Sequence, residues 1–306
     1  MNFDLVLAGV GGQGVLSIAW VLDHAAHAAG WQLKQSEVHG MAQRGGAVSA
    51  FVRLSDAPVA SDLIAAGSAS LIASVEPLEA LRYTGLLRTD GTVVTDVTPM
   101  VNIDNYPDHA ALYEVLFSVP NIVAVDATRL AHAAGTMKAQ NTVVLGAAAP
   151  LLPLPISAIE AQLQALFEPK GDRIVQANLR AFRKGNAACG FVQALRAAGV
   201  PAARVARVSA RLAFAPHPVD AELLAAWADR LLGPHGEATA AQVFAAPRLV
   251  PLDAVAGRSR PVPAPSSRIE PPCGARSRSS PSPAPAPARA TTTAPRAAAG
   301  SSEHPE

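Results

Sequence analysis

The chain has 306 residues, half of them hydrophobic, and a formal net charge of +1. This length permits one large core or two domains, and the charge gives no reason to expect a nucleic acid or an anionic membrane as partner. Two cysteines, Cys189 and Cys273, are too few for a disulfide scaffold or a four-ligand iron–sulfur cluster. The chain starts a strand by residue 4 without a basic leader and has no uninterrupted apolar run of membrane-spanning length. We therefore expect a cytoplasmic protein without a membrane span.

The first predicted elements form a strand, a glycine turn and a helix. Residues 5–8 are apolar, residues 9–14 read GVGGQG, and residues 15–29 are typical of a helix that ends at Gly30. This order opens doubly wound α/β domains, and Gly9, Gly11 and Gly14 have the G-x-G-x-x-G spacing. The free N–H groups at the start of the helix can attract a phosphate or carboxylate. The first candidate site, facing a ligand or a partner, is therefore Gly9, Gly11, Gly12, Gln13 and Gly14.

The glycine turn alone does not establish a dinucleotide site. Dinucleotide-binding domains place an acidic residue at the end of the second strand, where it holds a ribose. The candidate here is Glu37, which belongs to a different motif. A free-standing Rossmann-type NAD(P)-binding oxidoreductase stays an alternative, as does a tight turn that binds nothing.

The rest of the chain alternates between strand and helix patterns. Strands are predicted at 31–38, 47–54, 71–75, 92–96 (after a turn at Gly91) and 121–126. Helices are predicted at 78–87, at 128–134 before Gly135, at 158–167 with Ser157 as cap, and at 174–185, while 141–149 fits a strand or a helix. This alternation predicts an α/β fold, a three-layer Rossmann-like domain with a mostly parallel sheet.

Composition divides the chain into three parts. The α/β domain is predicted at 1–187, and an alanine- and arginine-rich helical extension at 188–256. Residues 257–306 hold eleven of the 26 prolines, among Ala, Ser and Arg, which predicts a disordered tail.

A second motif, SEVHGMAQRGG at 36–46, follows the second predicted strand and should reach the same sheet edge as the glycine turn. Its glycines let backbone approach a ligand or partner closely, and Arg44 offers a planar, bidentate donor. The simpler interpretation is a solvated loop in which Arg44 pairs with Glu37. The second candidate site consists of Glu37, His39, Gly40, Gln43, Arg44, Gly45 and Gly46.

Together GVGGQGV, SEVHGMAQRGG and VRLS resemble the gamma-type subunit of the 2-oxoacid:ferredoxin oxidoreductases. The VHGMAQRGG form favours the indolepyruvate (arylpyruvate) branch of that family. Further similar segments lie at 76–83, 141–145 and 178–185, so the resemblance covers about residues 3–187. The chain departs from the family at Ala60-Ser61-Asp62, and the tail has no counterpart there.

The resemblance implies a non-redox subunit that completes an active site. The complex would decarboxylate an aromatic 2-oxoacid oxidatively to its acyl-CoA and pass electrons to ferredoxin. Thiamine diphosphate and the [4Fe–4S] clusters would belong to a large alpha subunit, coenzyme A would be a substrate, and this chain alone would hold no cofactor. No catalytic residue and no metal site is assigned. His24 and His27 are three residues apart on the first predicted helix, but no carboxylate or cysteine pattern in the sequence converges with them, so we expect surface residues. A non-catalytic binding module on the same fold is a further alternative.

Overall fold

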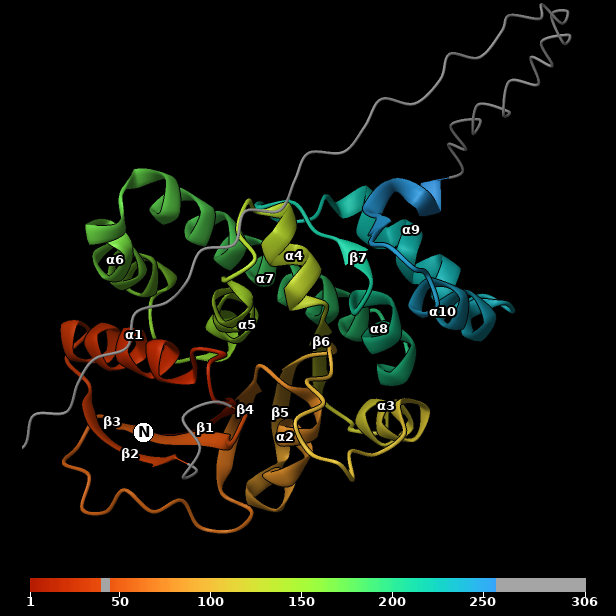
Figure 1. Ribbon diagram of the computed structural model, residues 1–306. Coiled ribbons are helices and arrows are strands. Elements are labelled where there is room, and N and C mark those ends of the chain that lie inside the picture. The colour runs from red at the N-terminus through yellow and green to blue at the C-terminus, as the bar shows by residue number, and fades with distance from the viewer. Residues whose placement is uncertain (40–44, 257–306) are drawn as a thin grey trace, which may run out of the picture. The chain divides into compact units, whose positions relative to one another are not determined.

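Strand β1 (Asn2–Val10) runs through the middle of a six-stranded sheet, and every residue from Phe3 to Val10 is buried. Figure 1 shows the computed structural model, which describes residues 1–39 and 45–256. The order of the strands is β2-β3-β1-β4-β5-β6. The other strands are β2 (Gln32–His39), β3 (Ala47–Ser55), β4 (Ala69–Ser74), β5 (Leu87–Asp96) and β6 (Ile122–Val125), with a short separate pair, β7 (Leu212–Ala213) and β8 (Val250–Pro251).

The helices alternate with the strands over the first part of the chain and then dominate. They are α1 (Val15–Ala28), α2 (Pro77–Arg82), α3 (His109–Phe117), α4 (Ala127–Ala133), α5 (Gln140–Ala148), α6 (Ile156–Phe167), α7 (Asp172–Ala197), α8 (Ala202–Ser209), α9 (Ala221–Leu232) and α10 (Gly236–Phe244). Short 3₁₀ turns lie at η1 (Thr84–Leu86), η2 (Ala149–Leu151), η3 (Glu168–Lys170) and η4 (Leu252–Ala256).

The sheet is mostly parallel, as predicted. Strands β1, β4, β5 and β6 pair in parallel, and β3 is antiparallel to both of its neighbours, β1 and β2. Because β2 then runs in the same direction as β1, its last residue lies at the same edge of the sheet as the glycine turn. The α/β fold class is confirmed.

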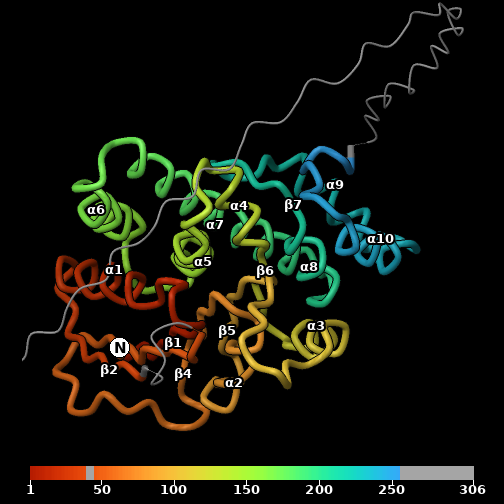
Figure 2. The backbone as a smooth tube through the Cα atoms, viewed as in Figure 1, coloured from red at the N-terminus to blue at the C-terminus, as the bar shows by residue number. Residues whose placement is uncertain are grey.

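Alternating residues of β1 pack into two different cores. Leu5 and Leu7 belong to the larger core, with α1, α5 and α7, whereas Val6 belongs to a smaller core with α2, α3 and α8. Figure 2 shows the same division, with α1, α5, α6 and α7 above the sheet. Burial on both faces explains why β1 reads as a continuous apolar run.

The segment that fitted either a strand or a helix is helix α5, which packs very closely against α7. A Cβ at Gly146 would lie 1.9 Å from the Phe182 carbonyl oxygen, and a Cβ at Gly185 would lie 2.0 Å from the Val143 carbonyl oxygen. Only glycine permits this approach at either position. The predicted helix end at Gly185 is therefore wrong, because Gly185 is a contact point inside α7 and not a terminator.

Two other predicted boundaries are also wrong. Gly91 lies inside β5, where the register against β4 shifts, and a Cβ there would meet the Ala69 carbonyl oxygen at 3.0 Å. Helix α6 begins at Ile156 behind Pro155, without a side-chain cap, so Ser157 lies in its first turn. Gly91 therefore has a packing role inside its strand, whereas Ser157 is exposed on α6 and does not cap it.

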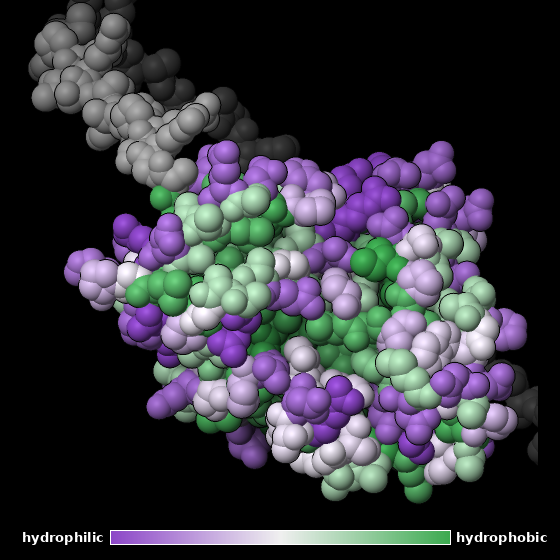
Figure 3. Space-filling view, turned by 180° about the vertical axis from the view of Figure 1, so that it is seen from behind, coloured by the Kyte–Doolittle hydropathy of each residue, from purple (hydrophilic) through white to green (hydrophobic). Residues whose placement is uncertain are grey.

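The region after residue 187 continues from the α/β layers without a break in α7. Helix α8 lies against β6, and the Ser209 hydroxyl donates to the Ala124 carbonyl at 2.8 Å. Lys184 on α7 donates to the Phe214 carbonyl at 2.6 Å. Among the described helices, none combines the length and the apolar character that crossing a membrane requires. Figure 3 shows the face opposite to that of Figure 1, with hydrophobic side chains gathered in its middle between more hydrophilic margins.

Candidate functional site

The glycine turn at the end of β1 is closed by the side chain of Gln13. The Val10 N–H donates to Gln13 Oε1 at 2.8 Å, and Gln13 Nε2 donates to the Val75 carbonyl at 3.0 Å. Gly9 lies beneath this bridge, where a Cβ would come within 2.4 Å of Val75 Cγ2. Gln13 therefore ties the turn to the end of β4, so its amide is occupied by the backbone.

The last glycine of the turn contacts the start of α5. Gly14 precedes α1 at a φ of 80°, and a Cβ there would lie 2.5 Å from Asn141 Nδ2. That amide donates to the Gly14 carbonyl at 3.1 Å. Gly12 also has a positive φ, 99°, and within residues 1–39 and 45–256 no heavy atom lies within 4 Å of its Cβ position. Gly12 is thus the most open point of the turn.

The second motif meets the glycine turn directly. The Gly11 N–H donates to the Gly46 carbonyl at 2.8 Å, the Gly45 N–H donates to the Gly11 carbonyl at 3.4 Å, and Asn102 Nδ2 donates to the Gly45 carbonyl at 2.6 Å. Two motifs that are separate in the sequence therefore form one backbone surface at the sheet edge.

The remaining residues of that motif are placed only in part. Glu37 lies on β2 and accepts from Gln35 Nε2 at 2.7 Å, and His39 ends the strand. Gly40, Gln43 and Arg44 lie outside the described residues, so the pairing of Arg44 with Glu37 stays a hypothesis. Strand β3 separates β2 from β1, which puts Glu37 two strands, about 10 Å, from the glycine turn. This order counts against the ribose contact of a dinucleotide-binding domain, whose second strand adjoins its first.

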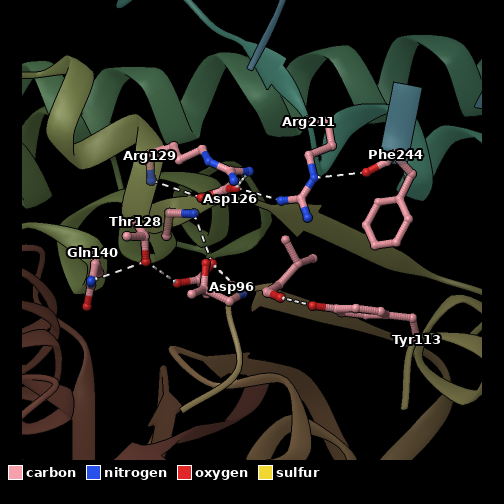
Figure 4. A network of polar contacts seen from close by, with 11 residues as sticks. Asp96, Tyr113, Asp126, Thr128, Arg129, Gln140, Arg211 and Phe244 are labelled. Atoms are coloured by element: carbon pink, nitrogen blue, oxygen red, sulfur yellow. Dashed lines mark hydrogen bonds and ion pairs between the residues drawn. The ribbon is translucent and has the colours of Figure 1, made fainter. Parts of the chain in front are cut away.

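Two neighbouring strands end in buried aspartates, which Figure 4 shows. Asp96 ends β5 and accepts from the N–H groups of Thr98 and Ala127, both at 3.0 Å. Asp126 follows β6 and accepts from Arg129 Nη1 at 2.8 Å and from Arg211 Nη1 at 2.6 Å. Only Asp126 therefore has cations as direct partners.

The pKa of Asp96 is strongly shifted. Burial, and next the nearby charge of Asp126, raises its pKa to about 7. The Thr128 hydroxyl lies 3.4 Å from Asp96 Oδ2 and accepts from Gln140 Nε2 at 3.2 Å. Asp96 lines a cleft of about 440 Å³ together with Gly11, Gly12, Gln13, Thr98, Pro99, Met100, Thr128 and Gln140. A carboxyl that titrates near neutral pH beside an open cleft can hold or release a proton there.

A third buried acid organises the end of β4. Glu76 caps α2 by accepting from the Glu79 N–H at 2.7 Å, and its other oxygen accepts from the Tyr106 hydroxyl and from the Met100 N–H. Burial, followed by the contact with Glu76, raises the pKa of Tyr106. Glu76 thus fixes the loop that carries Met100, and Met100 lines the same cleft as Asp96.

A second cleft, of about 740 Å³, adjoins the glycine turn and shares Gly12, Gln13 and Gln140 with the first. Its walls combine the start of α1 with two lysines, Lys138 and Lys170, and with the apolar side chains of Met137, Phe167 and Ile174. Free helix N–H groups and ammonium groups suit an anion, and the apolar wall suits a hydrocarbon chain. The cleft therefore has the character of a site for a phosphorylated or carboxylated organic molecule.

The described residues do not fit a metal or a cluster. No group of three or more His, Cys, Asp or Glu side chains among residues 1–39 and 45–256 could hold a metal ion. Cys189 is buried, and burial raises the pKa of its thiol to about 12, which suppresses the thiolate that ligation needs. His24 stacks on Trp20 and contacts the Trp20 carbonyl at 2.8 Å.

Sequence reasoning missed Asp96, Asp126 and Glu76. A signal was available, because three successive predicted strands each end in, or just before, an acidic residue: Val75-Glu76, Thr95-Asp96 and Val125-Asp126. The carboxyl ends of parallel strands meet at one edge of the sheet, where such domains place ligands. The ion pair of Arg211 with Asp126 has no comparable signal in the sequence.

The family of this chain is shown by residues 4–188, which match the family model described as pyruvate ferredoxin/flavodoxin oxidoreductase. The chain belongs to the pyruvate ferredoxin/flavodoxin oxidoreductase family. The matched part includes the glycine turn, the second motif and all three buried acids. It ends inside α7, so α8–α10 lie outside the part that the family model matches.

Curated relatives place the chain among the subunits of this family. It is 35% identical over 192 residues to "Indolepyruvate oxidoreductase subunit IorB" of Archaeoglobus fulgidus, and 36% identical over 195 residues to the protein of that name from Thermococcus kodakarensis. Each match covers 60% of this chain and 94% of the relative. The resemblance to a gamma-type subunit of the indolepyruvate branch is confirmed.

A solved structure shows the same fold. The 2-oxoglutarate:ferredoxin oxidoreductase from Magnetococcus marinus, solved with 2-oxoglutarate, coenzyme A and succinyl-CoA bound, matches with a TM-score of 0.50 and 20% sequence identity. The match covers 61% of this chain and 31% of that longer chain. At this identity the likeness concerns the fold alone.

Proposed function

We propose that this chain is the non-redox subunit of an indolepyruvate (arylpyruvate):ferredoxin oxidoreductase that works in the cytoplasm. The observation that carries the proposal is the hydrogen-bonded junction of Gly11 with Gly46, which unites both family motifs at the sheet edge. The similarity to IorB subunits over nearly their whole length supports it. The complex would convert an aromatic 2-oxoacid to its acyl-CoA and pass electrons to ferredoxin.

The redox chemistry would come from a large alpha subunit. That subunit would hold thiamine diphosphate, which supplies the decarboxylation, and the [4Fe–4S] clusters, which carry the electrons. The two cysteines of this chain cannot ligate a cluster. The role left to this chain is to form one wall of the active site and to exclude water from it.

The residues at the sheet edge fit two parts of that role. Lys138 and Lys170, with the free N–H groups of α1, are suited to the phosphates of coenzyme A, and Met137 and Phe167 are suited to its pantetheine arm. Asp96, with its pKa near 7, would hold a proton at its carboxyl group in the adjoining cleft. Met100 and Val101, which are exposed beside that cleft, would face the alpha subunit.

The test is coexpression with an alpha-type subunit from the same genome under anaerobic conditions. We expect a brown complex that reduces a viologen dye when given indolepyruvate and coenzyme A. Activity should depend on both subunits. A stable complex that reduces the dye only with pyruvate or 2-oxoglutarate would contradict the arylpyruvate assignment.

Two results would favour the alternatives. Tight binding of NADH by the isolated chain would support a free-standing dehydrogenase. A chain that joins the alpha subunit but leaves its activity unchanged would be a non-catalytic binding module.

The coenzyme A site is tested by a double variant in the larger cleft. Lys138→Met with Lys170→Met should raise the Michaelis constant for coenzyme A, while Lys34→Met, which removes a lysine from the distant β2, should not.

A further inference from the structure

A cleft of about 670 Å³ lies in the helical extension, outside the part of the chain that the family model matches. It is formed between α9, α10 and the segment that ends in η4, at the blue end of the described chain in Figure 1. It is separate from the two clefts at the glycine turn, since neither of them shares a lining residue with it. Its walls include Trp227, Val243, Pro247 and Val250 among the apolar residues, and Arg230 and Gln242 among the polar ones.

Most of this wall is apolar and held rigidly. The Trp227 indole is buried, and its Nε1 donates to the Leu252 carbonyl at 2.8 Å, which fixes the ring between α9 and η4. Trp227 also packs edge-on against Phe191 of α7. A fixed aromatic ring flanked by valines, alanines and a proline accepts an apolar body at little cost in conformational entropy.

Of the described residues that line the cleft, one, Arg230, carries a positive charge. Arg230 Nε donates to Thr239 Oγ1 at 3.3 Å, which holds the guanidinium against the wall. Within residues 1–39 and 45–256, no carboxylate pairs with Arg230, whereas Arg204 and Arg207 on the neighbouring α8 both pair with Glu237. The terminal nitrogens of Arg230 thus remain available as donors, and Gln242 adds an uncharged polar side chain at the same wall.

We propose that this cleft binds a small monocarboxylate with an apolar aromatic or alkyl body. The single guanidinium matches one carboxylate, since its planar donors bind carboxylates bidentately. Among the described residues, the remaining wall offers no second cation for a dicarboxylate or a phosphate ester. The volume is that of a small-molecule site, which favours a ligand of this size over a protein segment.

The test is titration of the full-length chain with phenylacetate and with octanoate, two probes that share the carboxylate and differ in the apolar body. A variant with Trp20→Phe and Trp31→Phe retains Trp227 as its only tryptophan, so its fluorescence reports on the cleft. We expect saturable binding of at least one probe, a change in Trp227 emission and a rise in melting temperature. Phenylacetamide, which lacks the charge, should bind about ten- to a hundredfold more weakly than phenylacetate.

The matched variants are Arg230→Met and Arg248→Met. Both remove one exposed arginine near the cleft, but Arg248 is not among the residues that line it. Arg230→Met should weaken the carboxylate about ten- to a hundredfold and leave phenylacetamide unchanged, while Arg248→Met should bind like the parent. The proposal is overturned if neither probe binds saturably, if amide and carboxylate bind equally, or if the two variants lose equal affinity. A change in oligomeric state with no saturable binding would likewise overturn it, in favour of an interface.

Discussion

Asn141 and Gly14, 127 residues apart in the chain, are joined by a hydrogen bond of 3.1 Å from Asn141 Nδ2 to the Gly14 carbonyl. Gly14 begins α1 and Asn141 lies in the first turn of α5, so the bond ties together two helices that border the larger cleft. Since Gly14 has a positive φ and its Cβ position is filled by that amide, the contact requires glycine.

The glycine turn therefore offers a matched pair of substitutions. Gly14→Ala adds steric conflict with Asn141 to backbone strain and should lower the free energy of unfolding by about 2–4 kcal/mol. Gly12→Ala adds backbone strain alone, because its Cβ position is open, and should cost about 1–2 kcal/mol. Urea denaturation of both variants measures the difference. In an Asn141→Ala background the cost of Gly14→Ala should fall to that of Gly12→Ala, and an unchanged cost would contradict the assigned contact.

The sequence predicted this edge of the sheet better than it predicted the chemistry there. The glycine turn and the second motif carry local signals, since spacing and turn residues report on strand and helix ends. The junction of Gly11 with Gly46 depends on β3 lying antiparallel beside β1, and strand order has no local signal. The same holds for Arg211, which reaches Asp126 from a part of the chain 85 residues away.

Helix α3 shows a different limit. It begins at His109 behind Asp108, whose side chain accepts from the N–H groups of Ala110 and Ala111, so a capping signal was present. The helix was missed because its nine residues are a short stretch with weak apolar periodicity. A related reason explains why the sequence did not predict the roles of Gly91, Gly146 and Gly185. Their roles depend on the backbone of another element.

Asp96 should make the stability of the protein depend on pH. Its pKa is raised from 3.8 to about 7, so the carboxyl ionises in the unfolded chain before it ionises in the folded one. Asp96 therefore costs stability progressively as pH rises from about 4 to 7, and the full cost is present above 7. Asp96→Asn cannot ionise, and its stability relative to the parent should rise over that range, by about 1–4 kcal/mol at pH 8.

Thermal denaturation at pH 5 and pH 8 measures this effect. Asp90→Asn is the control, because Asp90 is exposed and, in the part of the chain that the structure describes, pairs with the exposed Arg88 alone. The melting temperature of Asp90→Asn should differ little from that of the parent at pH 5 and at pH 8. If the difference in melting temperature between Asp96→Asn and the parent stays constant or becomes smaller from pH 5 to pH 8, Asp96 is ionised at both values.

Arg44 remains the sequence-based choice for a contact with coenzyme A or with the alpha subunit. The residues that flank its segment, His39 and Gly45, lie at the sheet edge beside the glycine turn. Arg44→Lys should keep the subunit folded yet lower the activity of the reconstituted complex, and Arg44→Ala should lose about 2–4 kcal/mol of binding or transition-state free energy.

Circular dichroism of the subunit and steady-state kinetics with varied coenzyme A distinguish the two targets of Arg44. A higher Michaelis constant for coenzyme A would indicate the phosphate, and weaker association of the subunits would indicate the interface. An Arg44→Ala complex that assembles and turns over like the parent would reduce Arg44 to a solvated surface charge.

Arg211 should be the main polar anchor of the helical extension. Its Nη1 lies 2.6 Å from Asp126 Oδ2, and its Nε donates to the Phe244 carbonyl at the end of α10 at 3.0 Å. Both partners lie in buried or half-buried surroundings, and the guanidinium also lies over the Phe244 ring. Arg211→Met keeps the length of the side chain but leaves Asp126 with Arg129 as its sole cation among the described residues. This variant should lower the free energy of unfolding by about 2–4 kcal/mol.

Hydrogen exchange shows in which elements Arg211→Met loses stability, and this is more informative than the size of the loss. Hydrogen exchange should increase in α8 and α10 and remain unchanged in β1, because Arg211 links the extension to β6 and not to the central strand. Arg88→Met, which breaks an exposed pair, should cost less than about 1 kcal/mol and leave exchange in α8 and α10 unaltered. If Arg211→Met instead raises exchange evenly across the sheet, the ion pair stabilises the whole fold. The extension would then unfold together with the sheet and not separately from it.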